Sequence, residues 1–192
     1  MNKHNITKKY ISKLNQCLDE ISLQSETIEL IVNIIFDSYK LGGEVFILGN
    51  GGSATTASHC ALSFEKDSAI RGKPHIRAKC LSDSMGLVTA WANDSNYASV
   101  FEQQLVYQIN KNDVVIAISG SGNSTNIIVA AEYAKSVGAK VIGMVGFSGG
   151  RLKDIADICI TLTSRDYGPI EDTHLAIVHI ITESLKEKLL NE

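Results

Sequence analysis

The chain has 192 residues, of which 44% are hydrophobic and 20% charged, and its formal net charge is −3. This length predicts one domain, residues 1–192, that can bury a core without disulfide bonds. The acidic balance argues against nucleic acid as a partner, and no apolar run reaches the ~18 residues that a membrane helix needs. No apolar stretch follows the lysines near the N-terminus, so we expect no signal peptide. The four cysteines form no C-x-x-C pair, which is typical of reduced thiols in a cytoplasmic protein.

The first part of the chain, residues 1–42, is predicted to be helical. Apolar residues recur there at helical spacing in two stretches, and the second stretch ends at Gly42–Gly43, a typical C-terminal cap. We therefore expect a helical hairpin in front of an α/β core that comprises residues 43–192.

A strand–turn–helix unit then repeats along the core. The strand candidates are residues 44–48, 77–81, 113–118, 140–145 and 158–162. Helices are expected from about Ser53, over 127–137, shortly after Gly150 and over 169–190. Short apolar strands that alternate with helices predict an α/β fold, a three-layer α-β-α sandwich around a five-stranded parallel sheet. Ligands of such sheets bind beyond the carboxyl ends of the strands, where the Gly/Ser/Asn turns of this sequence lie.

One of these turns, SGSGNS at 119–124, has the properties of a phosphate site. It offers the hydroxyls of Ser119, Ser121 and Ser124, two glycines that let the backbone curl, and a helix N-terminus behind it. It contains neither the Walker pattern nor the dinucleotide-binding fingerprint. The turn therefore predicts a site for a small anion, in particular a phosphate group.

Several motifs occur together and in order: GNGGSA at 49–54, a histidine at 59, WAND at 91–94, ISGSGNS at 118–124, GFSGGRL at 146–152 and E-D-x-H-x(4)-H at 171–179. This ordered set resembles the sugar isomerase (SIS) family, and within it the phosphoheptose isomerases. The resemblance implies a cytoplasmic homotetramer that converts sedoheptulose 7-phosphate to D-glycero-D-manno-heptose 7-phosphate. It also implies that the helices of residues 1–42 pack at subunit interfaces.

The resemblance further implies which residues bind the seven-carbon sugar phosphate. The serines of the loop bind the phosphate, and the N-G-G turn and the N-D pair meet the sugar hydroxyls. In this sequence the expected substrate-binding residues are Asn50, Gly51, Gly52, Ser53, Asn93, Asp94, Ser119, Gly120, Ser121, Ser124 and Glu171.

Ketose–aldose isomerisation moves a proton between C2 and C1, which needs a base and a group that stabilises the enediolate oxygen. The resemblance implies a zinc site made by a His-x-x-x-Glu pair, a Gln and a second His. Those positions are His59, Ser63, Glu171 and His179 in this sequence. We expect His59, Glu171 and His179 to hold the zinc, with a fourth place for water or substrate. Glu171 and His179 are also the expected catalytic residues.

Ser63 stands where the resemblance implies a glutamate, and two interpretations remain open. The acid has moved to Glu171, or the family's base has been lost. Glu65, two residues further, lies ~200° round a regular helix from Ser63 and is expected to point away. The alternative functions are therefore an isomerase for another sugar phosphate and a non-catalytic SIS-type module that binds a phosphosugar or a protein.

The spacing of the expected ligands on the last helix raises a geometric problem. Glu171 and His179 are eight residues apart, which is ~12 Å along a regular helix. Two ligands of one metal at this spacing would be strained. Either the helix begins irregularly near Pro169, or the site draws residues from two subunits.

Overall fold

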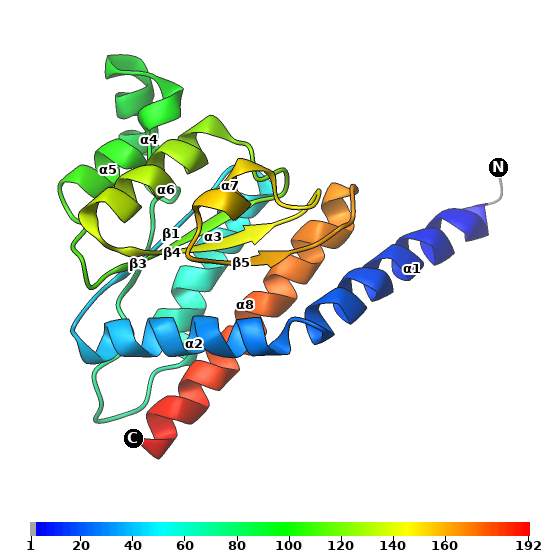
Figure 1. The fold of residues 1–192 in the computed structure, drawn as a ribbon, viewed down its shortest axis with the longest axis horizontal. Helices are drawn as coiled ribbons and strands as arrows, with labels where there is room; N and C mark the ends of the chain where they lie inside the picture. Colours follow the sequence, from blue (N-terminus) through cyan, green and yellow to red (C-terminus); the bar gives the residue numbers. More distant parts are fainter. Residues whose placement is uncertain (1–2) are drawn as a thin grey trace.

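The computed structural model describes residues 3–192, and within them a five-stranded parallel sheet lies between two layers of helices (Figure 1). Its strands are β1 (Val45–Gly49), β2 (Ala78–Cys80), β3 (Val114–Ser119), β4 (Lys140–Val145) and β5 (Ile158–Thr161). The strand order is β2-β1-β3-β4-β5, and every neighbouring pair is parallel. All residues of β1 and β3 are buried, which explains their continuous apolar sequences. The predicted three-layer α/β fold is confirmed.

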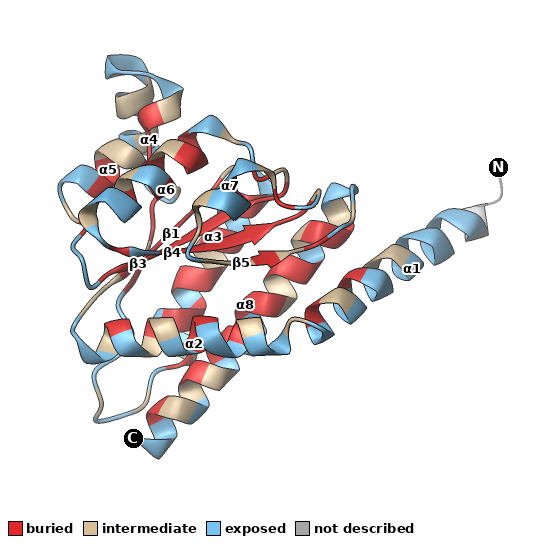
Figure 2. Ribbon diagram, viewed as in Figure 1, coloured by how far each residue is buried: buried red, intermediate tan, exposed pale blue. Residues whose placement is uncertain are grey.

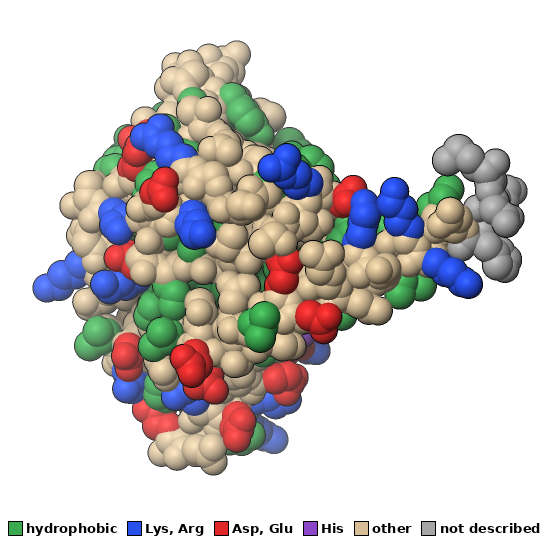
Figure 3. Space-filling model, turned by 45° about the vertical axis from the view of Figure 1, so that its right-hand side comes forward, with side chains coloured by type: hydrophobic (Ala, Val, Ile, Leu, Met, Phe, Trp, Pro, Cys, Tyr) green, Lys and Arg blue, Asp and Glu red, His purple; other side chains and the backbone are tan. Residues whose placement is uncertain are grey.

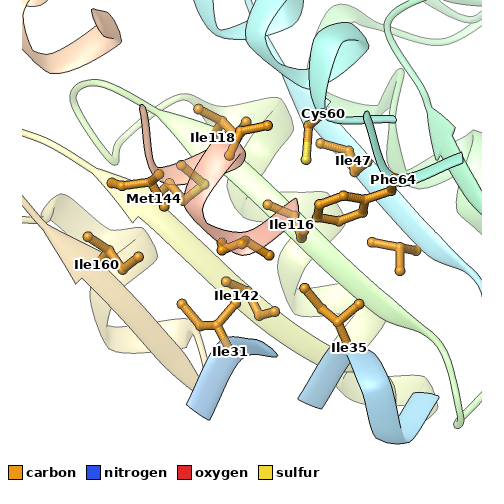
Figure 4. Close-up of a cluster of buried hydrophobic side chains, with 14 of the residues drawn as sticks. Ile31, Ile35, Ile47, Cys60, Phe64, Ile116, Ile118, Ile142, Met144 and Ile160 are labelled. Carbon is orange, nitrogen blue, oxygen red and sulfur yellow. The ribbon is translucent and has the colours of Figure 1, made fainter. Parts of the chain in front are cut away.

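The helices are α1 (Lys3–Ser22), α2 (Ser25–Lys40), α3 (Gly52–Leu62), α4 (Met85–Asp94), α5 (Glu102–Val106), α6 (Thr125–Val137), α7 (Gly150–Ile155) and α8 (Tyr167–Asn191). A π-helical turn, η1 (Ser63–Asp67), follows α3, and a 3₁₀ turn, η2 (Tyr97–Ser99), precedes α5. Helices α2, α3 and α8 bury one face of the sheet, whereas α5, α6 and α7 bury the other. Figure 4 shows the first core, in which α2 contributes Ile31 and Ile35 and the end of α3 with η1 contributes Cys60 and Phe64.

The two predicted N-terminal helices are present, although residues 1–2 lie outside the described part of the chain. They do not fold back on each other as a hairpin. Helix α1 instead packs against the first half of α8 and then projects away from the sheet (Figure 1). Tyr10 donates a hydrogen bond of 2.6 Å to Asp172, and Lys13 pairs with Asp166. Because these contacts hold only one side of α1, most of its surface stays exposed (Figure 2).

Helix α4 is unusual because it contains no buried residue in the described chain. Its apolar residues Met85 and Leu87 are exposed. This helix was not predicted from the sequence, since it packs only the partly buried Val88, Trp91 and Ala92 against the core.

The surface shows no strong charge segregation on the face drawn in Figure 3, where acidic and basic side chains are interspersed. Among the described residues, none of the helices is both long enough and apolar enough to cross a bilayer.

Candidate active site

The serine loop joins β3 to α6 and is folded by its own hydroxyl and glycine residues. The Ser119 hydroxyl accepts a hydrogen bond of 3.1 Å from the amide of Gly122, and its Oγ lies 3.5 Å from that of Ser124. Gly122 has φ +65°, and a Cβ there would overlap the carbonyl oxygen of Gly149. Glycine is therefore required where this loop meets the next turn of the sheet edge. Ser124 caps α6 by position, but its side chain makes no cap hydrogen bond in the described structure, so its hydroxyl is available to a ligand.

A hollow of about 150 Å³ lies over this loop, and we call it the serine pocket. It is lined by Asn50, Ser53, Ile118, Ser119, Gly120, Ser121, Ser124, Tyr167 and Glu171. The pocket lies beyond the carboxyl ends of β1 and β3, where the N-termini of α3 and α6 converge. Seven of the expected substrate-binding residues are thus brought together, and the helix termini favour an anion between them.

The glycine turn after β1 is held against α8. A Cβ on Gly52 would lie only 2.5 Å from Oε2 of Glu171, so the carboxylate uses the space that the missing side chain leaves. Gly51, with φ +55°, makes the turn that begins α3. Glu171 therefore belongs to the serine pocket and lies against Gly52.

Three polar residues around the pocket were missed by the sequence analysis. The side-chain amides of Asn50 and Asn126 exchange two hydrogen bonds, of 2.8 and 2.9 Å. The hydroxyl of Tyr97 also donates to Asn50 Oδ1, at 2.9 Å. Tyr167 lines the pocket directly. Asn126 lies two residues after the serine loop, and this position could have identified it from the sequence. Tyr97 and Tyr167 belong to no local motif.

Asn93 and Asp94 are placed elsewhere by the structure. Both are exposed at the end of α4, with Asn93 Nδ2 donating a 2.8 Å hydrogen bond to Asp94 Oδ1. They lie outside the lining of the serine pocket, so their expected contact with substrate remains a prediction.

A pair of histidines joins α3 to α8. His59 Nε2 and His179 Nε2 are 3.0 Å apart, and the ring centroids are 5.0 Å apart. Glu171 does not join them, because α8 runs as one helix from Tyr167 and separates Glu171 from His179 by two turns. The described residues contain no cluster of three His, Cys, Asp or Glu side chains that could hold a metal ion. The expected three-ligand set is therefore not assembled within one chain, and an irregular start of the last helix is not the explanation.

A second hollow, of about 420 Å³, lies between η1 and α8, and we call it the π-turn pocket. It is lined by Ser63, Lys66, Asp67, Ala69, His179, Thr182, Glu183 and Lys186. Ser63 is only 1% exposed, and its Oγ has no hydrogen-bond partner among the described residues. The ammonium of Lys66, 2.8 Å from Asp67, lowers the pKa of that carboxyl group, and the nearby His59 adds a smaller effect in the same direction.

The fold and the loop together define a family. The SIS domain profile matches residues 9–146, and the chain belongs to the SIS domain family. The phosphoheptose isomerase of Mycobacterium tuberculosis (strain ATCC 25177 / H37Ra) is 37% identical over 164 residues, which cover 85% of this chain and 83% of that protein. The phosphoheptose isomerase of Aliarcobacter butzleri is 33% identical over 189 residues, or 97% and 98% of the two chains. Within the SIS family the chain thus belongs with these enzymes, the phosphoheptose isomerases.

Solved structures agree with this placement. A phosphoheptose isomerase from Francisella tularensis superposes with a TM-score of 0.90 at 25% identity, covering 97% of this chain and all of that one. The phosphoheptose isomerase GmhA from Neisseria gonorrhoeae superposes with a TM-score of 0.88 over 96% and 98% of the chains, which at 22% identity supports the fold. The family and the fold predicted from the motifs are both confirmed.

Proposed function

We propose that this chain converts sedoheptulose 7-phosphate to D-glycero-D-manno-heptose 7-phosphate. The observation that carries the proposal is the spacing of the serine pocket and the histidine pair. Ser53 lines the pocket and His59 lies six residues further along α3, which is ~9 Å on a regular helix. An extended seven-carbon sugar has a comparable distance between C2 and the phosphate at C7. The phosphate and the reacting carbons can therefore reach both places at once.

Different residues contact the phosphate end, the sugar hydroxyls and the reacting carbons of the substrate. The hydroxyls of Ser119, Ser121 and Ser124 bind the phosphate, with the N-terminus of α6 behind them. Asn50 and Glu171 are positioned for the sugar hydroxyls nearest to the phosphate. His179 lies at the reacting end, where a histidine can give or take a proton near neutral pH.

The residues of one chain supply only part of a zinc site. His59 and His179 would supply two nitrogen ligands, and their Nε2 atoms already face each other at 3.0 Å. A zinc ion held there would polarise the carbonyl oxygen of the substrate. We propose that the remaining ligands come from the substrate or from a second copy of the chain, including its Glu171. Metal analysis of the purified protein tests this: His59→Ala together with His179→Ala must abolish stoichiometric zinc, and wild type without zinc contradicts it.

Assembly as a cytoplasmic homotetramer belongs to the same proposal. The exposed apolar residues of α1 and α4 support self-association, because surfaces of this kind are usually covered in an assembly. The four cysteines are all free, which agrees with a reducing compartment.

The proposal is tested by incubating the purified protein with sedoheptulose 7-phosphate and measuring the aldose formed. Ser124→Ala should raise KM by about tenfold, since a hydrogen bond to a charged group contributes ~1.5 kcal/mol or more. Ser136→Ala, at an exposed position near the other end of α6, is the matched control and should leave KM unchanged. Binding of the sugar phosphate without turnover in wild type would instead favour a non-catalytic module.

A further inference from the structure

The π-helical turn after α3 changes which residue follows His59 on the same side of the helix. The amide of Ser68 donates to the carbonyl of Ser63 at 3.1 Å, the i→i+5 hydrogen bond that defines such a turn. On a regular α-helix Asp67 would lie ~80° round the axis from His59. The π turn has about one more residue per turn, so each residue rotates less about the axis. This cancels most of the ~80° between His59 and Asp67. Asp67 therefore lies on the side of the helix that carries His59.

The lining of the π-turn pocket places this carboxylate opposite the second histidine. Asp67 contributes from η1 and His179 from α8, and Ser63 lies between His59 and Asp67 along the chain. Asp67, Ser63 and His179 therefore line one pocket.

The Ser63 hydroxyl indicates that the pocket receives a ligand. A buried polar group without a partner costs roughly 1–3 kcal/mol, and such groups are rare in folded proteins. Ser63 lines the pocket, and its side-chain oxygen is buried and unpartnered among the described residues. Lys66 and Lys186 add two cationic donors to the same wall. These groups suit a polyhydroxylated end of a sugar whose oxygens gain negative charge during reaction.

We propose that the π-turn pocket binds the C1–C2 end of the sugar phosphate and that Asp67 is the carboxylate that moves the proton there. This inference rests on the proposed function. The carboxylate takes a proton from C1, and the C1–H electron pair becomes the C1=C2 bond while the C2 oxygen takes up a proton from solvent. Loss of the proton from the C1 hydroxyl and return of a proton to C2 then give the aldehyde. No oxidant or reductant is needed, and all atoms are conserved.

The other acids near this place fit less well. Glu65 lies in the same turn but is exposed and outside the pocket lining. Glu183 lines the pocket, yet it is exposed, whereas Asp67 is half-buried. Glu171 belongs to the serine pocket beside Gly52.

The test compares Asp67→Asn with Glu65→Gln, a matched removal of a charge in the same turn. We expect Asp67→Asn to lower kcat at least ~100-fold, the range of a lost general base, with KM within about threefold of wild type. Exchange of solvent deuterium into the sugar should fall in parallel, while the thermal stabilisation by sugar phosphate is retained. Glu65→Gln should keep kcat within about twofold, and Asp67→Glu should recover part of the activity, which a purely structural role would not predict.

Three outcomes overturn the inference in distinguishable ways. If Asp67→Asn keeps kcat within about threefold of wild type, Asp67 does not move the proton. If Glu183→Gln loses activity and Asp67→Asn does not, the carboxylate is Glu183. If wild type does not turn over sedoheptulose 7-phosphate, the proposed function fails as well, and this result is separate because it needs no variant.

Discussion

The carboxylate of Glu171 lies directly beside Cα of Gly52, so that a Cβ at position 52 would be 2.5 Å from Oε2. Gly52 begins α3 and Glu171 is the fifth residue of α8, and these helices pack against each other on one face of the sheet. This contact fixes a negative charge at the rim of the serine pocket. It also means that residue 52 controls where that charge lies.

Gly52→Ala is expected to displace the Glu171 side chain without unfolding the protein. The overlap is with the far end of a flexible side chain, which can move, and alanine is a better helix former than glycine. The melting temperature should therefore change little, while kcat/KM for the sugar phosphate falls by about tenfold or more. Steady-state kinetics with a thermal melt measure both.

Gly86→Ala is the control for that substitution. Gly86 is also a glycine in a first helical turn, but a Cβ there would meet nothing within 4 Å. Its kinetics should match wild type. Equal losses of activity in both variants would show that the Glu171–Gly52 contact has no role in the reaction.

His174 predicts a pH dependence of stability. It is fully buried, neither ring nitrogen has a hydrogen-bond partner among the described residues, and burial lowers the pKa to about 4 from 6.5. As the pH falls from 6.5 to about 4, the unfolded chain therefore binds a proton at this histidine and the folded chain does not. The free energy of unfolding should drop by about 3 kcal/mol between pH 6.5 and 4, and this contribution is fully present above pH 6.5.

Denaturant titrations at several pH values, on wild type and on His174→Leu, isolate this contribution. The difference in unfolding free energy between the two proteins should change with pH over that window, because leucine has no proton to bind. His75→Asn, at an exposed position, should keep the wild-type profile. Parallel profiles for wild type and His174→Leu would contradict the assignment.

The exposed apolar surface of α1 predicts self-association. Ile6 and Ile11 are 66% and 50% exposed on a helix that projects from the body of the chain (Figure 2). We expect a tetramer in sedimentation experiments at micromolar concentration. Ile11→Glu should shift the protein to smaller species, since a buried charge at an interface is costly. Ser136→Glu, on the opposite helical layer, should leave the tetramer intact, and a monomeric wild type would refute the prediction.

The sheet and its turns could be predicted because each strand carries its own signal. The segments around β1, β3 and β4 are continuous apolar runs that end in glycine-rich turns, and such runs are typical of buried parallel strands. The serine loop was recognised in the same way, since its hydroxyls, glycines and helix start are contiguous. The sequence was therefore sufficient to predict the parts of the site that are formed by contiguous residues.

The remaining parts depend on contacts between distant segments. Helix α4 packs only the partly buried Val88, Trp91 and Ala92 against the core and buries no residue fully, so its hydrophobic spacing gave a weak signal. The spacing along the chain alone could not decide whether Glu171 joins His59 and His179 in one metal site. The structure separates them because α8 is regular. The π turn that redirects Asp67 departs from the regular helix on which the direction of Glu65 was worked out.

The central claim is most directly tested by isomerisation of sedoheptulose 7-phosphate in deuterated water, followed by NMR spectroscopy of the product. The account predicts an aldose 7-phosphate that carries deuterium at C2, formed by wild type and strongly reduced in Ser124→Ala at low substrate concentration. Unchanged sedoheptulose 7-phosphate, with no deuterium at C1 after prolonged incubation with the zinc-loaded protein, would contradict it.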